Sequence, residues 1–481
     1  MSERLRRARN PRTGALDYSF VCPDAPVVER AVIRARAAQP AWSEGGVPAR
    51  AAALNGLADQ IEQHRPGLQL ALECDTGRRR LAGAEIDAVL AALRGWPLRA
   101  AELLRSGWSA GRSMPHLRYT SEWRPYPVVG VVSPWNFPLL LSMIDAIPAL
   151  CAGCAVIVKP SEVTPRFIEP LAACAQVIPQ LADVLQLLPG DVTTGEALVD
   201  AADCICFTGS VATGRKVASR AAARLVPAYL ELGGKDPLLV LAGADLAIAV
   251  RAALRGAVLA SGQACQSIER IYVAREIHDE FVERLCEAAR AVRLNWPDIA
   301  HGELGPIIFE GQARTLAEQI EDARGRGARV LTGGVIETHG GGLWMRPTVL
   351  TQVTHEMLIM REETFGPVLP VMPFDSIEEA VQLANWGRFG LSAAIIAPTL
   401  DQAACLARRL EAGAVSLNDA ALTALFYEAP KQSFKASGLG PSRMGPDALL
   451  RFCRRQALIA NEAEPAALAA FAEDARPPGS G

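Results

Sequence analysis

Short apolar runs separated by helical stretches are the feature that most limits the fold of this chain. In the first half the runs occupy residues 128–132, 155–158, 184–188, 204–207, 225–231 and 237–241. Helical patterns stand between most of these runs, and residues 27–39, 49–63 and 84–104 precede them with helical periodicity. Continuous apolar runs that alternate with helices are typical of buried parallel strands joined by right-handed crossovers.

The second half of the chain repeats this scheme. Apolar runs lie at residues 270–274, 329–331, 368–374, 392–396 and 414–418, with helical patterns at 278–293, 311–326 and 400–412. A chain of 481 residues is too long to form a single hydrophobic core. The sequence therefore predicts an α/β protein with two tandem, doubly wound parallel-sheet domains.

Some segments fit neither domain. Residues 116–124 alternate as a solvent-side ribbon does, and 454–461 form an isolated strand pattern. Residues 462–481 are rich in Ala, Glu and Pro, which predicts a flexible tail. The basic residues between Arg4 and Arg12 lack the apolar segment of a secretory signal, so we expect a solvated tail there.

Charge, hydropathy and cysteine usage exclude several classes of function. The net charge of −3 provides no attraction for nucleic acid. The longest apolar stretch, residues 146–158, is too short to span a membrane. The eleven cysteines have no regular spacing, and neither Cys151-x-x-Cys154 nor the scattered histidines complete a metal site. We expect a reducing, cytoplasmic setting with no metal, no nucleic acid and no membrane.

A possible phosphate site follows the run at 204–207. No G-x-G-x-x-G motif follows a strand, but Gly209 and Ser210 form a turn before a helical pattern. Arg215 and Lys216 occupy the positions that a P-loop gives to lysine and a hydroxyl residue, which disfavours a nucleoside triphosphate. Backbone N–H groups at a helix start can bind a phosphate. A tight structural turn would explain the same residues equally well.

Lys159 and Glu162 stand at the end of the run at 155–158, where a parallel sheet binds ribose hydroxyls. A carboxylate there favours a free 2′-hydroxyl, and so favours NAD over NADP, although NADP stays possible. A solvated strand end is the alternative.

Three further segments carry reactive or polar side chains. Cys265 follows a small-residue turn, and a thiolate is a strong nucleophile. Glu231 ends an apolar run beside Gly233 and Gly234, where backbone can approach a ligand closely. Asn136 lies between two prolines, which fix the loop around its amide, although a plain loop is the default interpretation of that segment alone.

Together these segments resemble the aldehyde dehydrogenase superfamily over residues 16–461. They follow the family order: P-W-N-F-P (134–138), K-P-S-E (159–162), F-T-G-S (207–210), E-L-G-G-K (231–235), G-Q-x-C (262–265), E-E-x-F-G-P (362–367), G-x-V-x-x-N (413–418) and K-x-S-G (435–438). Each motif is weak alone, but all of them in register are hard to obtain by chance.

The resemblance implies oxidation of an aldehyde to a carboxylic acid with NAD. Cys265 would attack the carbonyl and form a thioester, Asn136 would stabilise the oxyanion, and Glu231 would activate the hydrolytic water. The implied cofactor-binding residues are Trp135, Lys159, Ser161, Glu162, Gly209, Ser210, Gly233, Glu363 and Phe365. The implied substrate pocket contains Phe137, Leu141, Ile144, Gln266, Phe426 and Tyr427, which suits a medium-sized apolar or aromatic aldehyde.

The resemblance also implies the domain boundaries. The NAD-binding domain would comprise residues 1–106 and 126–235, with 436–453 packing back on it, and the catalytic domain residues 236–435. Residues 107–125 and 454–461 would form the small oligomerisation ribbon, and 462–481 the flexible tail. In the family this ribbon joins a partner's sheet, so we expect a homodimer or homotetramer.

Departures from the family pattern leave the substrate open. Where relatives have an aromatic residue and two glycines, this chain has Lys431, Gln432 and Ser433. Lys431 either attracts a substrate carboxylate or points to solvent. Two alternatives therefore stay open: a semialdehyde-specific or coenzyme-A-acylating enzyme, and a catalytically silent paralogue with a binding role. The presence of Glu231 argues against acyl transfer to coenzyme A.

Overall fold

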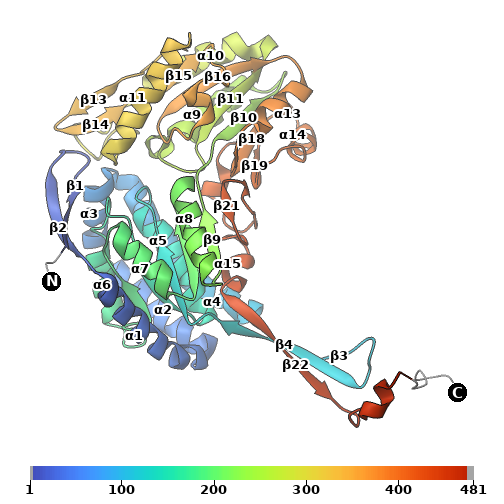
Figure 1. The fold of residues 1–481 in the computed structure, drawn as a ribbon. Coiled ribbons are helices and arrows are strands. Elements are labelled where there is room, and N and C mark those ends of the chain that lie inside the picture. Colours follow the sequence, from blue (N-terminus) through green and yellow to red (C-terminus); the bar gives the residue numbers. More distant parts are fainter. Residues whose placement is uncertain (1–3, 474–481) are drawn as a thin grey trace.

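The computed structural model describes residues 4–473, which form two α/β units and a long ribbon (Figure 1). The first unit contains a six-stranded sheet in the order β21-β9-β8-β5-β6-β7, in which only the edge strand β21 is antiparallel to its neighbour. Its strands are β5 (Val128–Val132), β6 (Ala155–Lys159), β7 (Leu185–Leu187), β8 (Cys204–Thr208), β9 (Ala228–Glu231) and β21 (Gly438–Leu439).

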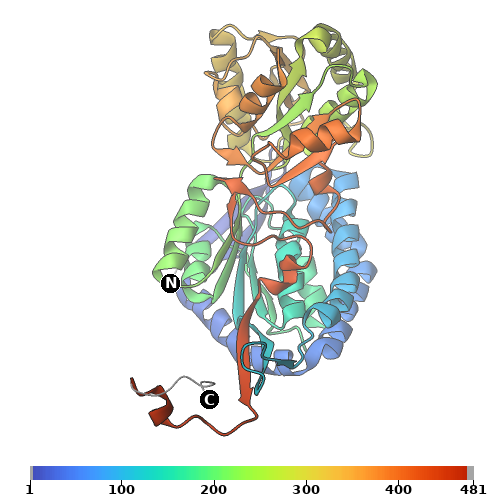
Figure 2. The ribbon, with the colours of Figure 1, turned by 90° about the vertical axis from the view of Figure 1, so that its right-hand side faces the viewer.

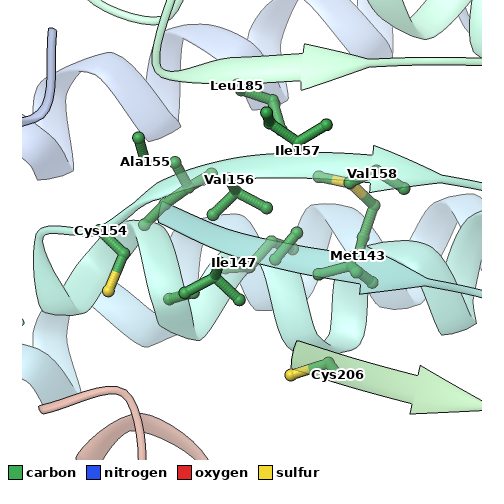
Figure 3. Close-up of a cluster of buried hydrophobic side chains, with 14 of the residues drawn as sticks. Met143, Ile147, Cys154, Ala155, Val156, Ile157, Val158, Leu185 and Cys206 are labelled. Carbon is green, nitrogen blue, oxygen red and sulfur yellow. The ribbon is translucent and has the colours of Figure 1, made fainter. Parts of the chain in front are cut away.

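Helices cover both faces of this sheet (Figure 2). They are α1 (Ala25–Glu44), α2 (Gly46–Gln63), α3 (Arg65–Thr76), α4 (Arg79–Leu103), α5 (Pro138–Ala152), α6 (Ile168–Gln176), α7 (Val192–Ala201), α8 (Val211–Ala223) and the short α15 (Asp447–Leu450). Because both faces are covered, every residue of β6 and β8 is buried. Figure 3 shows Met143 and Ile147 of α5 packed against Val156 and Val158 of β6.

The second unit contains a seven-stranded sheet in the order β12-β15-β16-β11-β10-β18-β19, parallel except for β12. Its strands are β10 (Asp236–Val240), β11 (Ile268–Ala274), β12 (Arg329–Val330), β15 (Thr348–Thr351), β16 (Val368–Phe374), β18 (Ser392–Ile396) and β19 (Ala414–Leu417). Its helices are α9 (Leu246–Val258), α10 (Arg275–Ala291), α11 (Glu310–Gly325), α12 (Leu358–Arg361), α13 (Ile377–Asn385) and α14 (Leu400–Ala407). The predicted α/β fold with two parallel sheets is confirmed.

The remaining elements are small. A hairpin pairs β13 (Ile336–His339) with β14 (Gly342–Met345), and a two-stranded sheet joins β17 (Phe389–Gly390) to the distant β20 (Phe434–Lys435). Three 3-10 turns are η1 (Leu259–Gly262), η2 (Leu422–Ala424) and η3 (Leu468–Phe471). The last of these lies in the segment expected to be a flexible tail, of which residues 474–481 fall outside the described residues.

A ribbon projects away from both units (Figure 1). It consists of β3 (Ser109–Ala110), β4 (Leu117–Pro125) and β22 (Cys453–Asn461). β22 pairs antiparallel with β4 along its full length, from Cys453 opposite Pro125 to Asn461 opposite Leu117. The two segments whose patterns matched neither sheet are therefore neighbours in one ribbon.

The prediction of a solvated tail near the N-terminus was wrong. Residues Arg4–Arg9 form β1, which pairs antiparallel with β2 (Leu16–Cys22). Arg4 and Arg6 both form ion pairs with Asp191, at 3.3 Å and 3.4 Å. The charge run is thus held by a partner strand and a distant carboxylate, which local sequence does not reveal.

The predicted start of the strand at 225–231 also differs. The apolar run at 225–231 begins as a turn, since Leu225 has a φ of 56° and is exposed, and the strand starts only at Ala228. Among residues 4–473, no helix combines the length and the apolar character needed to cross a membrane.

Candidate active site

Cys265 lies in a tightly constrained turn between α9 and β11. The three residues Ala260, Ser261 and Gly262 precede it with φ values of 58°, 59° and 68°. Such a run of left-handed residues is costly and persists only where the surroundings enforce it. A Cβ at Gly262 would lie 2.2 Å from the carbonyl carbon of Gly366, so only glycine fits against that neighbouring loop.

Gln263 anchors this turn from within the protein. Its side chain is fully buried, donates to the carbonyl of Pro306 at 3.0 Å and accepts from the N–H of Ile308 at 2.9 Å. Its own carbonyl accepts a hydrogen bond of 3.0 Å from Nδ2 of Asn136. The amide of Asn136 is therefore fixed beside the cysteine turn. No local sequence pattern predicts this anchoring role of Gln263.

Two buried charged residues form hydrogen bonds with the backbone of the Asn136 segment. Arg78 donates to the carbonyl of Asn136 and to that of Ala260, and its guanidinium lies 5.0 Å from the centre of the Phe137 ring. Glu85 accepts from the N–H groups of Leu139 and Leu140 at the start of α5, at 3.1 Å and 3.0 Å. Burial raises the pKa of Glu85 to about 7 and lowers that of Arg78 to about 10. The sequence carried no local signal for either role.

Asn136, Glu231 and Cys265 line one pocket, although they come from distant parts of the chain. The large apolar side chains that line the pocket are Phe137, Leu140, Leu141, Ile144, Leu259, Tyr427 and Met444. Its polar lining residues include Gln266, Arg255 and Arg443. Of the predicted pocket residues, all but Phe426 line this pocket in the described part of the chain. Phe426 is 54% exposed. Tyr427 takes the inward position instead, with its hydroxyl donating to Ala424.

Glu231 ends β9 and has two polar neighbours. Ser433 donates to its Oε2 at 3.3 Å, and Nζ of Lys431 lies 3.7 Å from the same atom. Burial raises the pKa of Cys265 to about 12, an effect that the charge of Lys431 opposes and the charge of Glu231 reinforces. The thiol is therefore protonated at neutral pH unless its surroundings change.

A second groove lies at the carboxyl ends of β5, β6 and β8. Trp135, Lys159, Ser161, Glu162 and Gly209 line it, and Nζ of Lys159 donates to Glu162 at 3.3 Å. This is the edge of a doubly wound sheet at which dinucleotides bind. The donor set fits a dinucleotide: a cation and a carboxylate for ribose hydroxyls, and an indole and a glycine turn beside them.

Ser210 stands at the start of α8, next to the groove. It is not among the described residues that line the groove. Its Oγ accepts from the N–H of Thr213 at 3.3 Å, which makes it the N-cap of α8.

Glu363, Gly233 and Phe365 connect the two units. Oε1 of Glu363 accepts from the N–H of Gly234 at 3.2 Å, and a Cβ at Gly233 would lie 2.6 Å from its other oxygen. The ring of Phe365 meets that of Trp135 edge-on at 5.2 Å. Burial raises the pKa of Glu363 to about 8. None of the three lines the groove within residues 4–473, but Phe365 contacts Trp135, which does.

Comparison with known proteins agrees with this arrangement. The aldehyde dehydrogenase family matches residues 2–458. A protein of Mycolicibacterium smegmatis is 38% identical over 433 residues, which are 89% of this chain and 83% of that protein; its name reads "Putative succinate-semialdehyde dehydrogenase" and specifies NADP(+). A "4,4'-diapolycopene aldehyde oxidase" of Methylomonas sp. is 36% identical over 450 residues, or 92% and 84% of the two chains.

Solved structures are similar over nearly the whole chain. The "Putative Aldehyde Dehydrogenase PutA" of Anabaena variabilis has a TM-score of 0.95 and 49% identity, and covers 97% of this chain and 99% of its own. A Staphylococcus aureus betaine aldehyde dehydrogenase in complex with NAD+ has a TM-score of 0.91 and 28% identity, with coverage of 98% and 96%. The chain belongs to the aldehyde dehydrogenase family and is an oxidoreductase that acts on aldehydes with a nicotinamide dinucleotide, NAD or NADP.

Proposed function

We propose that this enzyme oxidises a medium-sized apolar or aromatic aldehyde to a carboxylic acid, with NAD and through a thioester on Cys265. The observation that carries the proposal is the shared pocket: a thiol, an amide and a carboxylate from three distant segments line one largely apolar space.

The chemistry follows from these three groups. After the thiol of Cys265 has given its proton to solvent, the thiolate bonds to the carbonyl carbon, and the oxygen gains negative charge that the Nδ2 of Asn136 and the N–H of Cys265 stabilise by about 3 kcal/mol for each donor. A dinucleotide in the groove lined by Trp135, Lys159 and Glu162 would supply the acceptor for the hydride that leaves this carbon. Glu231 then takes a proton from water as the water oxygen bonds to the thioester carbon, and the carbon–sulfur bond breaks to release the acid and the thiolate.

The apolar lining supports the substrate class. Leu140, Leu141 and Ile144 of α5 face the pocket together with Phe137 and Tyr427. An apolar tail gains about 25 cal/mol for each Å² that leaves water. A tail of this kind would therefore bind more tightly than a short polar one.

A semialdehyde is the second candidate, because two arginines also line the pocket. Arg255 pairs with Asp419 and donates to the carbonyl of Ala420 at 2.7 Å, and Arg443 donates to Asp145 at 2.6 Å. A carboxylate at the far end of a substrate could bind either guanidinium. The name of the mycolicibacterial relative also supports this candidate. Lys431, by contrast, is not among the described lining residues.

The test is a panel of aldehydes with NAD or NADP, with and without coenzyme A, using wild type and Cys265→Ser. Cys405→Ser is the matched control, since Cys405 is an exposed free cysteine. We expect NADH formation without coenzyme A, highest with apolar aldehydes, almost absent in Cys265→Ser and unchanged in Cys405→Ser. A requirement for coenzyme A would indicate an acylating enzyme. NADH formation that survives in Cys265→Ser would refute a thioester on Cys265. If the wild type forms no NADH with any aldehyde of the panel, the protein has a binding role.

We also propose that the ribbon of β3, β4 and β22 mediates formation of a homodimer or homotetramer. Its exposed large side chains include Trp108, Tyr119 and Ile459. Edge strands that project into solvent are normally covered by association. Light scattering on wild type and on Ile459→Lys tests this proposal, which predicts a smaller assembly for the variant and fails if both have the mass of one chain.

A further inference from the structure

The loop at residues 363–365 is held by one buried carboxylate. Oε2 of Glu269 accepts from the N–H of Thr364 at 2.8 Å, and Oε1 accepts from the N–H of Phe365 at 2.7 Å. Phe365 has a φ of 51°, in the left-handed region that a bulky side chain rarely adopts. Successive backbone N–H groups beside a left-handed residue form a site for an anion. The conformation of this loop therefore depends on the charge of Glu269.

A second buried charge fixes the orientation of that carboxylate. Nζ of Lys235 donates to Oε2 of Glu269 at 2.9 Å and to the hydroxyl of Thr364 at 2.6 Å. Lys235 and Glu269 are each only 2% exposed, so the ion pair is formed away from water. Because a buried charge that loses its partner is costly, the pair keeps the carboxylate directed at the loop.

The loop connects Glu269 to the dinucleotide groove. The ring of Phe365 meets that of Trp135 edge-on at 5.2 Å, and Trp135 lines the groove. Glu269 lies in β11, four residues after Cys265, but it lines neither the substrate pocket nor the groove within residues 4–473. Its contacts reach the groove through the loop and the Phe365 ring.

We propose that Glu269 is a positioning residue that holds the loop at 363–365, so that Phe365 packs against Trp135 and supports the wall of the dinucleotide groove. The proposal rests on the cofactor part of the function given above and not on the fate of the aldehyde. Without the carboxylate, the N–H groups of Thr364 and Phe365 lose their acceptor and the left-handed backbone of Phe365 is no longer enforced. The groove then binds the dinucleotide less tightly.

Isothermal titration calorimetry of NAD into wild type and Glu269→Gln measures this effect without any aldehyde; NADP is used in the same way. The amide of glutamine offers one oxygen where the carboxylate accepts from three donors, so we expect the Kd to rise about tenfold or more. Glu337→Gln is the matched control. Glu337 pairs with Arg346 at 2.8 Å and lines neither space in the described part of the chain, so the Kd should not change.

Two further readouts separate positioning from a general loss of structure. Phe365→Ala should itself raise the Kd, and adding Glu269→Gln to it should raise the Kd by no more than about twofold further, because both changes act on one contact. The release of p-nitrophenol from p-nitrophenyl acetate by Cys265 needs no dinucleotide. In Glu269→Gln its rate should stay within about twofold of wild type.

A double variant covers the case in which Glu269→Gln does not fold. Lys235→Met with Glu269→Leu replaces the buried pair by apolar side chains, a change that proteins often tolerate, and also removes the acceptor of the loop. It should raise the Kd for NAD about tenfold or more, as Glu269→Gln does.

The proposal is overturned if Glu269→Gln and the double variant both leave the Kd within about twofold of wild type, or if the effects of Glu269→Gln and Phe365→Ala multiply. It is also overturned if Glu269→Gln slows ester hydrolysis as much as it weakens NAD binding. Calorimetry needs no turnover. Weaker NAD binding by Glu269→Gln, in a protein that oxidises no aldehyde of the panel, would therefore refute the proposed function and keep this inference.

Discussion

Asp145 of α5 is the residue whose loss should be most costly for stability. It is 2% exposed, and its two oxygens accept from Arg443 at 2.6 Å and from Arg451. Both arginines are buried and belong to the segment that returns from the second unit to the first. Asp145 therefore attaches that segment to α5, directly beside the substrate pocket that Arg443 lines.

Asp145→Asn keeps the shape of the side chain and removes its charge. Two guanidinium groups would then lie buried without a neutralising partner, and breaking a buried ion pair from one side costs about 3–5 kcal/mol. A cooperative unit of 150–250 residues loses about 2–4 °C in Tm for each kcal/mol. The expected decrease in Tm is therefore about 6–20 °C.

The pH dependence of this effect has a definite sign. Burial alone would raise the pKa of Asp145, but the charges of Arg443 and Arg451 outweigh burial and hold the pKa below its ordinary value. A lowered carboxyl pKa stabilises the folded state fully above about pH 4, and this contribution is lost as pH falls through the folded-state pKa. The difference in Tm between wild type and variant should thus stay constant between about pH 6 and pH 8.

Thermal melting followed by circular dichroism measures this difference, and Asp200→Asn is the matched control. Asp200 pairs with Arg220 through two hydrogen bonds of 2.8 Å and 2.7 Å, but both side chains are exposed. An exposed pair contributes about 0–1 kcal/mol, so the control should change Tm by no more than a few degrees. Equal Tm changes for the two variants would refute the argument that burial makes the Asp145 cluster essential.

Three further variants test the site. Asn136→Ala should lower kcat by about 100- to 1000-fold with little change in KM, since one oxyanion donor is lost, and a decrease of less than tenfold would exclude that role. Glu162→Gln should raise the ratio of NADP to NAD efficiency by about tenfold or more, because it removes a repulsion of about 1–4 kcal/mol; an unchanged ratio would show that Glu162 does not select the cofactor. Gly262→Ala should lower both kcat and Tm, since its Cβ would collide with Gly366, whereas Gly67→Ala, with no atom within 4 Å of the added carbon, should not; equal behaviour of the two would contradict the close packing of the cysteine turn.

The fold was predictable from the sequence because buried parallel strands carry a strong local signal. The runs at 155–158 and 204–207 became β6 and β8, which are buried along their whole length. The N-terminal arginine run carried the opposite signal. Its charges suggested solvent, but strand pairing with β2 and the carboxylate of Asp191 decided its structure.

The site shows the same difference between residues with a local sequence signal and residues whose role depends on distant contacts. Asn136, Glu231 and Cys265 could be identified because each stands in a motif whose spacing is local. Arg78, Glu85 and Gln263 could not, since their partners lie far away along the chain and only the folded structure brings them together. Lys431 stood out as a departure from the family pattern, but its burial beside Glu231 contradicts the solvent-facing alternative and required coordinates to recognise.

The proposed reacting groups come from both units. Asn136 lies in the loop between β5 and α5 and Glu231 ends β9, both in the first unit, whereas Cys265 precedes β11 in the second. An oxyanion donor works only within about 3 Å of its target, so a small rotation between the units would abolish catalysis while leaving both units folded. The hydrogen bond from Asn136 to Gln263 and the one from Gly234 to Glu363 cross this boundary. The first contact joins Asn136 to the segment of Cys265, and the second joins the segment of Glu231 to Glu363 of the second unit, so both contacts fix the proposed reacting groups relative to one another across the boundary.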